Sequence, residues 1–199
     1  ARVLENLQKR NPADFTLWKA GKPGEPVWNS PWGEGRPGWH TECVVMGQKY
    51  LGETFDIHGG GADLIFPHHE NELAQALALT GKSLARYWMH NGFLNVDGDK
   101  MSKSLNNFFT ARDILARYSA EAVRFFFLSK HYRSPIDFNR EIIEESERAV
   151  KNFYAALRDI DYKSITSAPD GSYKSSEQAF VETMDDDLNT AKALAVLFD

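Results

Sequence analysis

The sequence predicts an α/β fold in which a doubly wound parallel sheet is followed by a helical region. Two observations carry this prediction. Between residues 39 and 96, segments with a helical pattern alternate with short aromatic and branched runs that are typical of strands. After Leu105 the pattern becomes helical almost throughout. In sheets of this kind, ligands bind in the crevice at the carboxyl ends of the strands.

Residues 1–38 begin with a short helical stretch and continue into a long loop. Proline and glycine are dense in residues 22–26 and 30–38, so we expect no regular structure there. Three tryptophans are expected to tie this loop down, namely Trp18, Trp28 and Trp32.

The next segments alternate helix and strand. Apolar positions predict a helix from Trp39 to Leu51, which Gly52 closes. Residues 55–58 predict a short strand, and the three glycines 59–61 predict the turn that follows it.

A second helix and a second strand complete this part of the pattern. Pro67 suits the first turn of a helix that ends at Gly81. The aromatic and branched residues 87–96 predict one strand, which ends at the turn Asp97-Gly98.

Helices dominate the remainder. Thr110 and Ser119 are expected to cap helices over 111–118 and 120–130, and residues 131–138 break the run. The later expected elements are a long amphipathic helix over 140–162, a polar linker over 163–176, and a helix pair beginning near Glu177 and Leu188.

The composition suits a globular protein with one domain and part of another. Of 199 residues, 42% are hydrophobic and 13% aromatic, which is enough to bury a core. No run of about eighteen apolar residues occurs, and the first residues do not resemble a signal peptide. We therefore expect a soluble, cytoplasmic protein without a membrane partner. The single cysteine, Cys43, excludes an internal disulfide.

Charge is unevenly distributed along the chain. The formal net charge of -5 argues against a protein that coats nucleic acid indiscriminately. Residues 100–133 nevertheless carry seven Lys or Arg against two acidic residues, whereas residues 134–199 carry seven against fourteen. The basic stretch fits either a local contact with a polyanion or solvated helix faces.

Three residues have the chemistry of zinc ligands. His68 and Glu72 are four residues apart on one face of the predicted helix, and Cys43 is the only thiol. His58 and His69 compete for the same role. The residues alone also fit a cysteine buried as a small hydrophobe beside a chance His and Glu pair.

Two segments are candidates for a nucleotide site. Glycines 59–61 let the backbone approach a flat ligand, and the helix that follows offers N–H groups to an anion. The lysines of Lys100-Met-Ser-Lys-Ser104 could neutralise charge that builds up on phosphate oxygens. Taken singly, the glycines also fit a tight turn, and the pentapeptide also fits a solvated basic loop.

Three motifs, in this order, resemble those of cysteinyl-tRNA synthetases, a family of class I aminoacyl-tRNA synthetases: Gly38-Trp-His-Thr-Glu-Cys43, Phe66-Pro-His-His-Glu-Asn-Glu72 and Lys100-Met-Ser-Lys-Ser104. The resemblance runs over nearly the whole chain. It implies a Rossmann-like nucleotide-binding domain, with its second half and the lysine loop in residues 39–108. Residues 1–38 would end a connective insertion, 109–162 would contact the tRNA stem, and 163–199 would be a linker and the start of a helical domain.

The resemblance also implies an activity. Cysteine would be activated with ATP and magnesium to cysteinyl-adenylate and then transferred to the 3′ end of tRNA(Cys). One zinc per catalytic site, held by Cys43, His68 and Glu72, would select cysteine as a thiolate, a bond that the hydroxyl of serine cannot match. No editing site would then be needed.

Further roles follow from the resemblance. Lys100 and Lys103 would be catalytic, with Lys103 the stronger candidate, Trp39 would form a wall of the amino-acid pocket, and Asp63 would hold the substrate ammonium. From residue type alone, Trp39 fits a core tryptophan equally well. The residues implied to lie against ATP are His58, Gly59, Gly60, Gly61, Trp88, His90, Lys100, Met101, Ser102, Lys103 and Ser104.

The sequence departs from the family pattern in ways that bear on activity. A further cysteine near the start of the family's catalytic domain, which supplies the fourth zinc ligand, has no counterpart in the 199 residues, and neither has the His-x-Gly-His type motif. The anticodon-reading end is not found either. We therefore expect weak zinc binding or none, and no cysteinyl-adenylate formation by this chain alone.

Other functions share parts of this pattern. The ligase that joins cysteine to an amino sugar in mycothiol synthesis shares the zinc and the lysine loop, but the intact segment 66–72 and the helical continuation favour the tRNA enzyme. A zinc hydrolase would place a metal-bound water at Cys43, His68 and Glu72, and it leaves the lysine loop unexplained. A noncatalytic tRNA-binding module would fit the missing half of the site.

Overall fold

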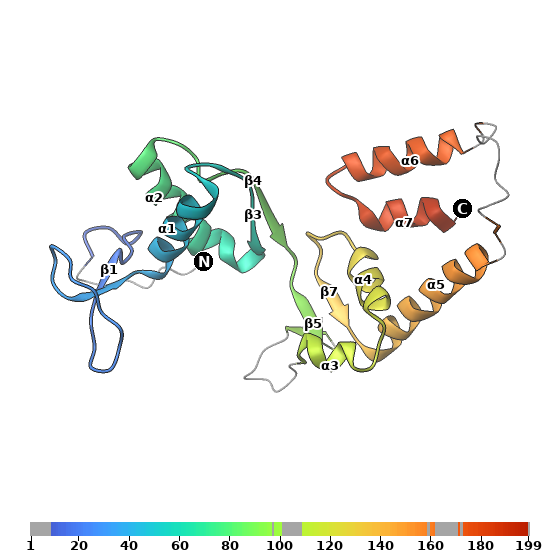
Figure 1. The fold of residues 1–199 in the computed structure, drawn as a ribbon, viewed down its shortest axis with the longest axis horizontal. Coiled ribbons are helices and arrows are strands. Elements are labelled where there is room, and N and C mark those ends of the chain that lie inside the picture. Colours follow the sequence, from blue (N-terminus) through green and yellow to red (C-terminus); the bar gives the residue numbers. More distant parts are fainter. Residues whose placement is uncertain are drawn as a thin grey trace. The chain divides into compact units, whose positions relative to one another are not determined.

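The structure is a computed structural model that describes residues 9–96, 98–100, 109–158, 160, 161, 171 and 173–198. It forms two compact units, Ala1–His90 and Asn91–Asp199 (Figure 1). The predicted helix at the start of the chain lies outside the described residues, and the predicted domain boundaries stay predictions. Within the described ranges, no helix combines the length and apolar character needed to span a membrane.

The first unit begins with a short antiparallel hairpin rather than an irregular loop. Strands β1, Trp18–Ala20, and β2, Gly35–Pro37, pair with each other, so the expectation of no regular structure in this segment is wrong for β2. Trp28 pairs with Gly35 through its backbone, but its side chain is 57% exposed, and Trp32 is 80% exposed. Burial of these two indoles therefore does not anchor the loop.

A helix and a strand then follow as predicted, with a different turn. Helix α1 spans Trp39–Leu51, and Gly52 closes it at a φ of 94°. Strand β3 spans Phe55–Gly61 and includes all three glycines. The predicted turn at 59–61 is therefore wrong, because the chain turns only afterwards, in the 3₁₀ helix η1, Ala62–Leu64.

The second helix begins irregularly. Ile65–His69 forms a single π-type segment, η2, in which Phe66 has extended backbone angles, and α2 continues over Glu70–Thr80. Gly81 ends α2 in the left-handed conformation, as predicted.

The predicted strand 87–96 is two strands. Strand β4 spans Ala85–Asn91 and pairs with β3, while β5 spans Leu94–Val96 in the second unit. The N–H of Phe55 donates to Leu84 O at the start of β3, and Gly59 lies beside Met89 further along, so β3 and β4 run in the same direction. Helices α1 and α2 pack together in this unit, and its core contains Val44, Ala76 and Leu84, with Phe55 and Trp88 packed against them.

The second unit contains a small sheet of three strands. Strand β5 lies between β6, Asp99–Lys100, and β7, Ile136–Phe138. The β5–β7 pair is parallel and the β5–β6 pair is antiparallel. The sequence predicted only a break at 131–138, because a three-residue strand leaves too little periodicity to detect.

Two short helices follow with the predicted caps. Helix α3, Ala111–Leu115, has a capping box in which Thr110 and Asp113 bond each other's backbone N–H groups. Helix α4, Ala120–Leu128, is capped by Ser119, whose hydroxyl accepts from the N–H of Ala122. Both helices end two or three residues earlier than predicted.

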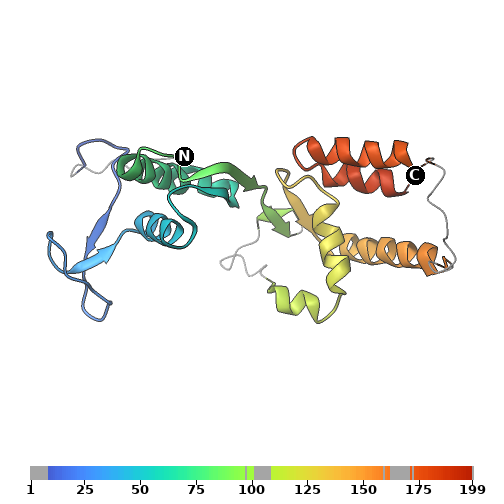
Figure 2. The same cartoon turned by 45° about the horizontal axis from the view of Figure 1, so that its top comes forward.

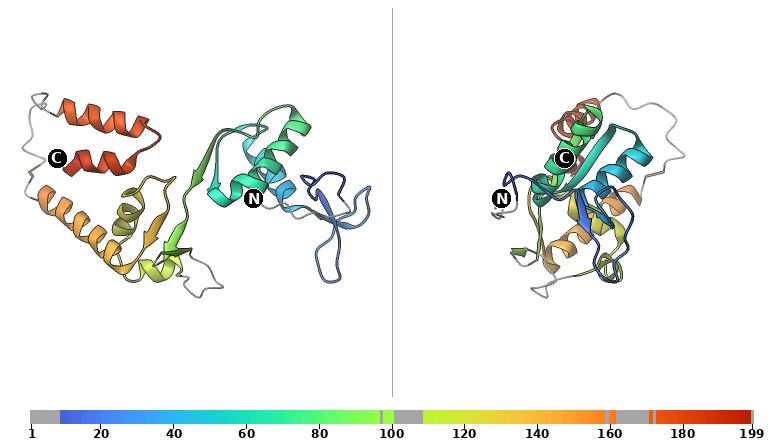
Figure 3. Two further views of the ribbon diagram at one scale, coloured as in Figure 1. Left: turned by 180° about the vertical axis from the view of Figure 1, so that it is seen from behind. Right: turned by 90° about the vertical axis from the view of Figure 1, so that its left-hand side faces the viewer.

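Helices α4, α5 and α7 pack around aromatic side chains. Helix α5 spans Arg140–Arg158, and the antiparallel pair α6, Lys174–Asp185, and α7, Thr190–Phe198, follows (Figures 2 and 3). Helix α6 therefore starts inside the predicted linker. Phe125 of α4, Phe153 of α5 and Phe198 of α7 have ring centroids 4.4 to 6.4 Å apart.

Asp187, in the turn between α6 and α7, is a further tie in this unit. Arg133 donates to its carboxylate from Nε at 2.5 Å and from Nη2 at 3.2 Å, and the hydroxyl of Tyr132 donates at 2.8 Å. These donors, Arg133 first, lower the pKa of Asp187 to about 2. Asp187 and Leu188 both have positive φ, which residues other than glycine rarely adopt.

We predict that replacing Asp187 by Asn removes part of the acid sensitivity of the fold. The pKa of Asp187 is about 2 when folded against an ordinary 3.8, so the folded state binds this proton less tightly than the unfolded state. Its contribution to stability is therefore complete above pH 3.8 and is lost as the pH falls towards 2. Urea unfolding of the wild type and Asp187→Asn should give free energies that differ near neutral pH and converge in acid.

The matched control is Asp186→Asn, because the Asp186 carboxylate lies 3.7 Å from Lys192 in an exposed pair that should contribute little to stability. A difference between the wild type and Asp187→Asn that is the same in acid as at neutral pH would contradict the role given to the Arg133–Asp187 pair.

Candidate metal centre

The centre of the candidate site is the buried carboxylate of Glu72, in the first turn of α2. The residue is 0% exposed and has an imidazole on each side. His58 Nε2 lies 2.5 Å from Oε2, and His68 Nε2 lies 3.0 Å from Oε1. A carboxylate taken out of water needs partners of this kind, because its desolvation otherwise costs several kcal/mol.

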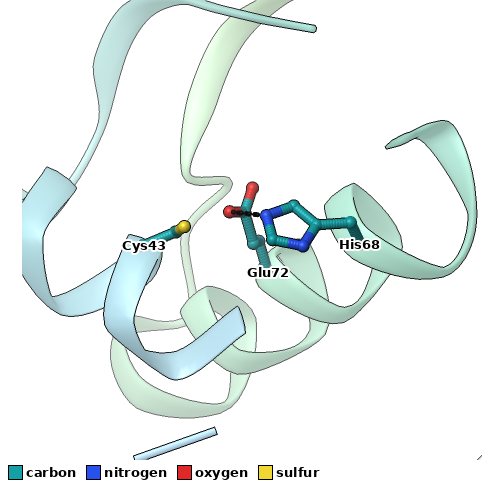
Figure 4. Close-up of side chains that lie close together, drawn as sticks. All are labelled: Cys43, His68 and Glu72. Atoms are coloured by element: carbon teal, nitrogen blue, oxygen red, sulfur yellow. Dashed lines mark ion pairs between the residues drawn. The ribbon is translucent and has the colours of Figure 1, made fainter. Parts of the chain in front are cut away.

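Cys43 completes a cluster of three possible metal ligands. Its side chain extends from α1 toward the carboxylate of Glu72, with the His68 ring on the far side of that carboxylate (Figure 4). One ligand atom from each of the three residues lies within 4.8 Å of the other two. The sequence therefore grouped these three side chains correctly, although Cys43 is 25 residues from His68 along the chain.

One atom of the cluster lacks a hydrogen bond. Glu72 Oε1 is fully buried, and no described side chain or backbone group meets it with hydrogen-bond geometry, even though His68 Nε2 is close. Zinc bonds of about 2.0–2.3 Å bring neighbouring donor atoms to within about 4 Å of each other. The donor atoms of this thiol, imidazole and carboxylate lie within 4.8 Å of one another, so their chemistry and grouping suit zinc, which would draw them closer together.

A second grouping of ligand atoms shares Glu72. His58, His69 and Glu72 also have ligand atoms within 4.8 Å of one another, as expected for the competing candidates. In this group, however, the carboxylate oxygen that faces His58 already has that imidazole as a hydrogen-bond partner. The oxygen that faces His68 lies 3.0 Å from that imidazole but makes no hydrogen bond, which favours the group with Cys43.

Burial sets the protonation of the surrounding groups. Burial, and then the charge of Glu72, raises the pKa of Cys43 to about 11, so the thiol keeps its proton at neutral pH when no cation is nearby. Burial, and then His58, lowers the pKa of His69 to about 4. The pKa of His40 is lowered as well, chiefly by burial. His40 and His69 are therefore uncharged at neutral pH.

His40 is a member of this cluster that the sequence analysis missed. Its Nδ1 lies 2.8 Å from Nδ1 of His68, so one of the two rings donates to the other. If His68 donates, its Nε2 is the unprotonated nitrogen that a metal can take. The signal was available, because His40 precedes Cys43 by three residues and so lies on the same face of α1.

The strand residues that were predicted to lie against ATP border the same cluster. His90 Nε2 of β4 lies 2.7 Å from His69 Nδ1, and the Trp88 ring centroid is 4.9 Å from that of His58. Gly60 lies against His69, where an added Cβ would come within 3.0 Å of His69 Cε1 and 2.8 Å of Leu64 Cδ1. The predicted nucleotide residues of β3 and β4 therefore adjoin the candidate metal ligands.

The remaining predicted residues divide into two groups. Trp39 is 63% exposed, with its ring centroid 4.9 Å from that of His68, so the alternative of a core tryptophan is wrong. Asp63 is exposed on η1. Of the lysine loop, only the backbone of Lys100 is described, in β6. The side chain of Lys100 and the residues Met101, Ser102, Lys103 and Ser104 lie outside the described residues.

Family comparison fits this geometry. Residues 1–148 match the family model for the class I (C) tRNA synthetase catalytic domain. The chain belongs to this family. A second model, for the DALR domain, matches residues 179–199, which cover part of α6 and all of α7.

Curated relatives are much longer than this chain. Cysteine–tRNA ligases from Geobacter metallireducens, Geobacter sulfurreducens and Syntrophotalea carbinolica are 53%, 54% and 55% identical to it over its whole length. The match covers 43%, 43% and 42% of those proteins. The chain therefore spans less than half the length of these members of the class I family.

A solved structure supports the fold. LeuRS from Agrobacterium radiobacter K84, determined as a ternary complex with tRNA and LeuAMS, matches with a TM-score of 0.62 over 86% of this chain and 28% of the other. At 14% identity, this likeness shows the α/β class I synthetase fold and nothing about the ligands of this chain.

We predict that Co²⁺, which stands in for zinc in titrations, binds this chain weakly through Cys43 and His68. Replacing His68 by Gln should weaken binding at least about tenfold, because it removes a ligand. The neighbouring variant His69→Gln is the matched control and should change the affinity little. Absorption from thiolate to cobalt reports the bound state.

The prediction would be contradicted if the affinity for Co²⁺ were unchanged in both His68→Gln and Cys43→Ser but lost in His69→Gln. That result would move the metal to the group formed by His58, His69 and Glu72.

Proposed function

We propose that this chain contributes the amino-acid pocket and part of the ATP site of a cysteine–tRNA ligase. The overall reaction would join cysteine to the 3′ end of tRNA(Cys) with consumption of ATP, in the cytoplasm. The observation that carries the proposal is the cluster of Cys43, His68 and Glu72, whose Oε1 makes no hydrogen bond, in a chain of this synthetase family.

The cluster suits a pocket that selects a thiol. Bound zinc would supply a soft cation that prefers a thiolate to the hydroxyl of serine. Cys43, His68 and Glu72 would hold it, and His40 and His58 would orient His68 and Glu72 through the contacts at 2.8 and 2.5 Å. The exposed Trp39, beside His68, would form an apolar wall of the pocket. Asp63 would hold the substrate ammonium.

The ATP side of the pocket would use β3, β4 and the lysine loop. The open backbone at glycines 59–61, with His58, Trp88 and His90, would lie against the adenosine. In the first step, a carboxylate oxygen of cysteine forms a bond to the α-phosphorus, and pyrophosphate leaves with the electrons of the broken P–O bond. Lys100 and Lys103 would neutralise the charge that builds up on the phosphate oxygens, and magnesium would accompany ATP.

The second step would need tRNA. A ribose hydroxyl of the 3′ end forms the new ester with the cysteinyl carbonyl, and AMP leaves. Residues 109–162 would contact the tRNA stem. Because the chain spans less than half of its curated relatives, we propose that it contributes to this reaction and does not complete it alone.

The proposal predicts that Lys103 is needed for adenylation and not for metal binding. We would test it in a chimera in which residues 1–199 replace the matching region of the Geobacter sulfurreducens relative. Lys103→Ala should lower the rate of cysteine-dependent pyrophosphate exchange by about a hundredfold or more. The zinc content should not change, because the candidate ligands lie in the other unit.

Lys151→Ala, which removes an exposed lysine of α5 that pairs with Glu147, should leave the rate of exchange unchanged. A zinc hydrolase would keep its activity in Lys103→Ala. Pyrophosphate exchange at the wild-type rate in Lys103→Ala would contradict the role given to Lys103.

A further inference from the structure

We propose that Asp137 is a positioning residue for adenylate formation, because its carboxylate holds the hairpin from which the lysine loop begins. The proposal rests on the proposed function for its consequence, and on described contacts for its geometry. Asp137 lies in β7, and its Oδ1 accepts a hydrogen bond from the N–H of Gly98 at 2.8 Å.

Gly98 lies in the turn between β5 and β6. Its φ of 84° is left-handed, as this tight turn requires, and an added Cβ would meet no atom within 4 Å. The hairpin is short, since only the pairs Asn95 with Lys100 and Val96 with Asp99 hold β6 to β5. A two-residue strand of this kind is marginal alone. A charged acceptor from a neighbouring strand therefore adds a third tie to the two residue pairs that hold it.

The strand that carries Asp137 is itself held in register. Strand β7 pairs with β5 in parallel, which places Asp137 opposite Asn95, and the N–H of Ile136 donates to Phe93 O at 2.9 Å. Two residues before Ile136, at Ser134, the backbone of this segment comes very close to that of Gly92. A Cβ on Gly92 would lie 2.2 Å from Ser134 O, so the fit of this segment against the chain before β5 requires glycine at 92.

The start of the same segment is anchored to the helix pair. The N–H of Gly92 donates to Tyr132 O at 2.8 Å, and the side chains of Tyr132 and Arg133 bind Asp187 between α6 and α7. Residues 131–138 are therefore fixed at one end by the helix pair, and at the other Asp137 fixes the Gly98 turn. The position of β6, and with it the start of the lysine loop, depends on this segment.

The contact between Asp137 and Gly98 affects where the lysine loop begins. Strand β6 ends at Lys100, the first residue of Lys100-Met-Ser-Lys-Ser104, two residues after the amide that Asp137 holds. Lysines contribute to phosphoryl chemistry only when their ammonium groups reach the reacting oxygens, and misplacement by about 1 Å can lower rates by about a hundredfold. Asp137 touches none of the reacting atoms, so its effect is on position.

Amide hydrogen exchange on the 199-residue chain tests the geometry directly. In Asp137→Ala, exchange of a peptide spanning 94–100 should speed up at least about tenfold, because the hydrogen bond to Gly98 is lost. Asp137→Asn keeps an oxygen acceptor at the same place and should restore slow exchange to within about twofold of the wild type. Unchanged exchange in Asp137→Ala would overturn the proposal.

Asn139→Ala is the matched control for damage to this segment. The Asn139 side chain accepts from the N–H of Ile142 at 2.9 Å and so stabilises the start of α5, two residues beyond Asp137. Its loss should speed exchange in the first turn of α5 and leave residues 94–100 protected. Faster exchange at 94–100 in this variant as well would assign the effect of Asp137→Ala to general loosening and overturn the proposal.

The chimera with the Geobacter sulfurreducens relative tests the consequence. Asp137→Ala should lower kcat for pyrophosphate exchange about tenfold with little change in the KM for cysteine, and Asp137→Asn should restore it. A loosened hairpin with an unaltered kcat would show a purely structural aspartate. A wild-type chimera without pyrophosphate exchange would refute the proposed function and the positioning role with it. Amide hydrogen exchange on the 199-residue chain would still decide whether Asp137 holds the hairpin.

Discussion

The first unit is organised around a carboxylate that is fully removed from water. Glu72 is held between His58 and His68, and its burial is tolerable only because these imidazoles and the nearby thiol of Cys43 surround it. Burial of the thiol raises the pKa of Cys43, and Glu72 Oε1 is left without a hydrogen bond. A buried carboxylate oxygen without a hydrogen bond is unfavourable in an ordinary core, and a bound cation would relieve it.

Local backbone geometry brings these side chains together. The open glycine backbone of β3 allows His69 to lie directly against the strand, where a Cβ on Gly60 would collide with it. The π-type segment over Ile65–His69 continues directly into α2. His68 is buried near the end of this segment, and Glu72 is buried in the first turn of α2. In the second unit, residues 131–138 connect two parts of the structure. Tyr132 binds Asp187 between α6 and α7, and Asp137 binds the turn between β5 and β6.

The sequence predicted the parts that depend on local chemistry. Helix α1 with its Gly52 end and the caps Thr110 and Ser119 are set by neighbouring residues, and the structure contains them as expected. The three metal-ligand candidates were found because the chain has one thiol and six histidines, His68 and Glu72 have helical spacing, and the motifs that contain all three resemble those of the synthetase family. His40 was missed although its spacing places it on the same face of α1 as Cys43, because its contact with His68 of η2 depends on the packing of segments that are distant in sequence.

Strand errors have a common cause. The glycines of β3 carry no side chain to indicate a strand, and β7 has three residues, so both are formed by pairing with distant segments rather than by their own pattern. The break at Gly92 likewise results from the approach of Ser134, about forty residues away along the chain. Tertiary contact, and not local propensity, decides these elements.

Zinc K-edge X-ray absorption on the metal-loaded chain tests the central claim most directly. If Cys43, His68 and Glu72 hold the ion, the first shell contains one sulfur at about 2.3 Å together with nitrogen and oxygen at about 2.0–2.2 Å. A first shell of nitrogen and oxygen alone would place the metal away from Cys43 and contradict the account.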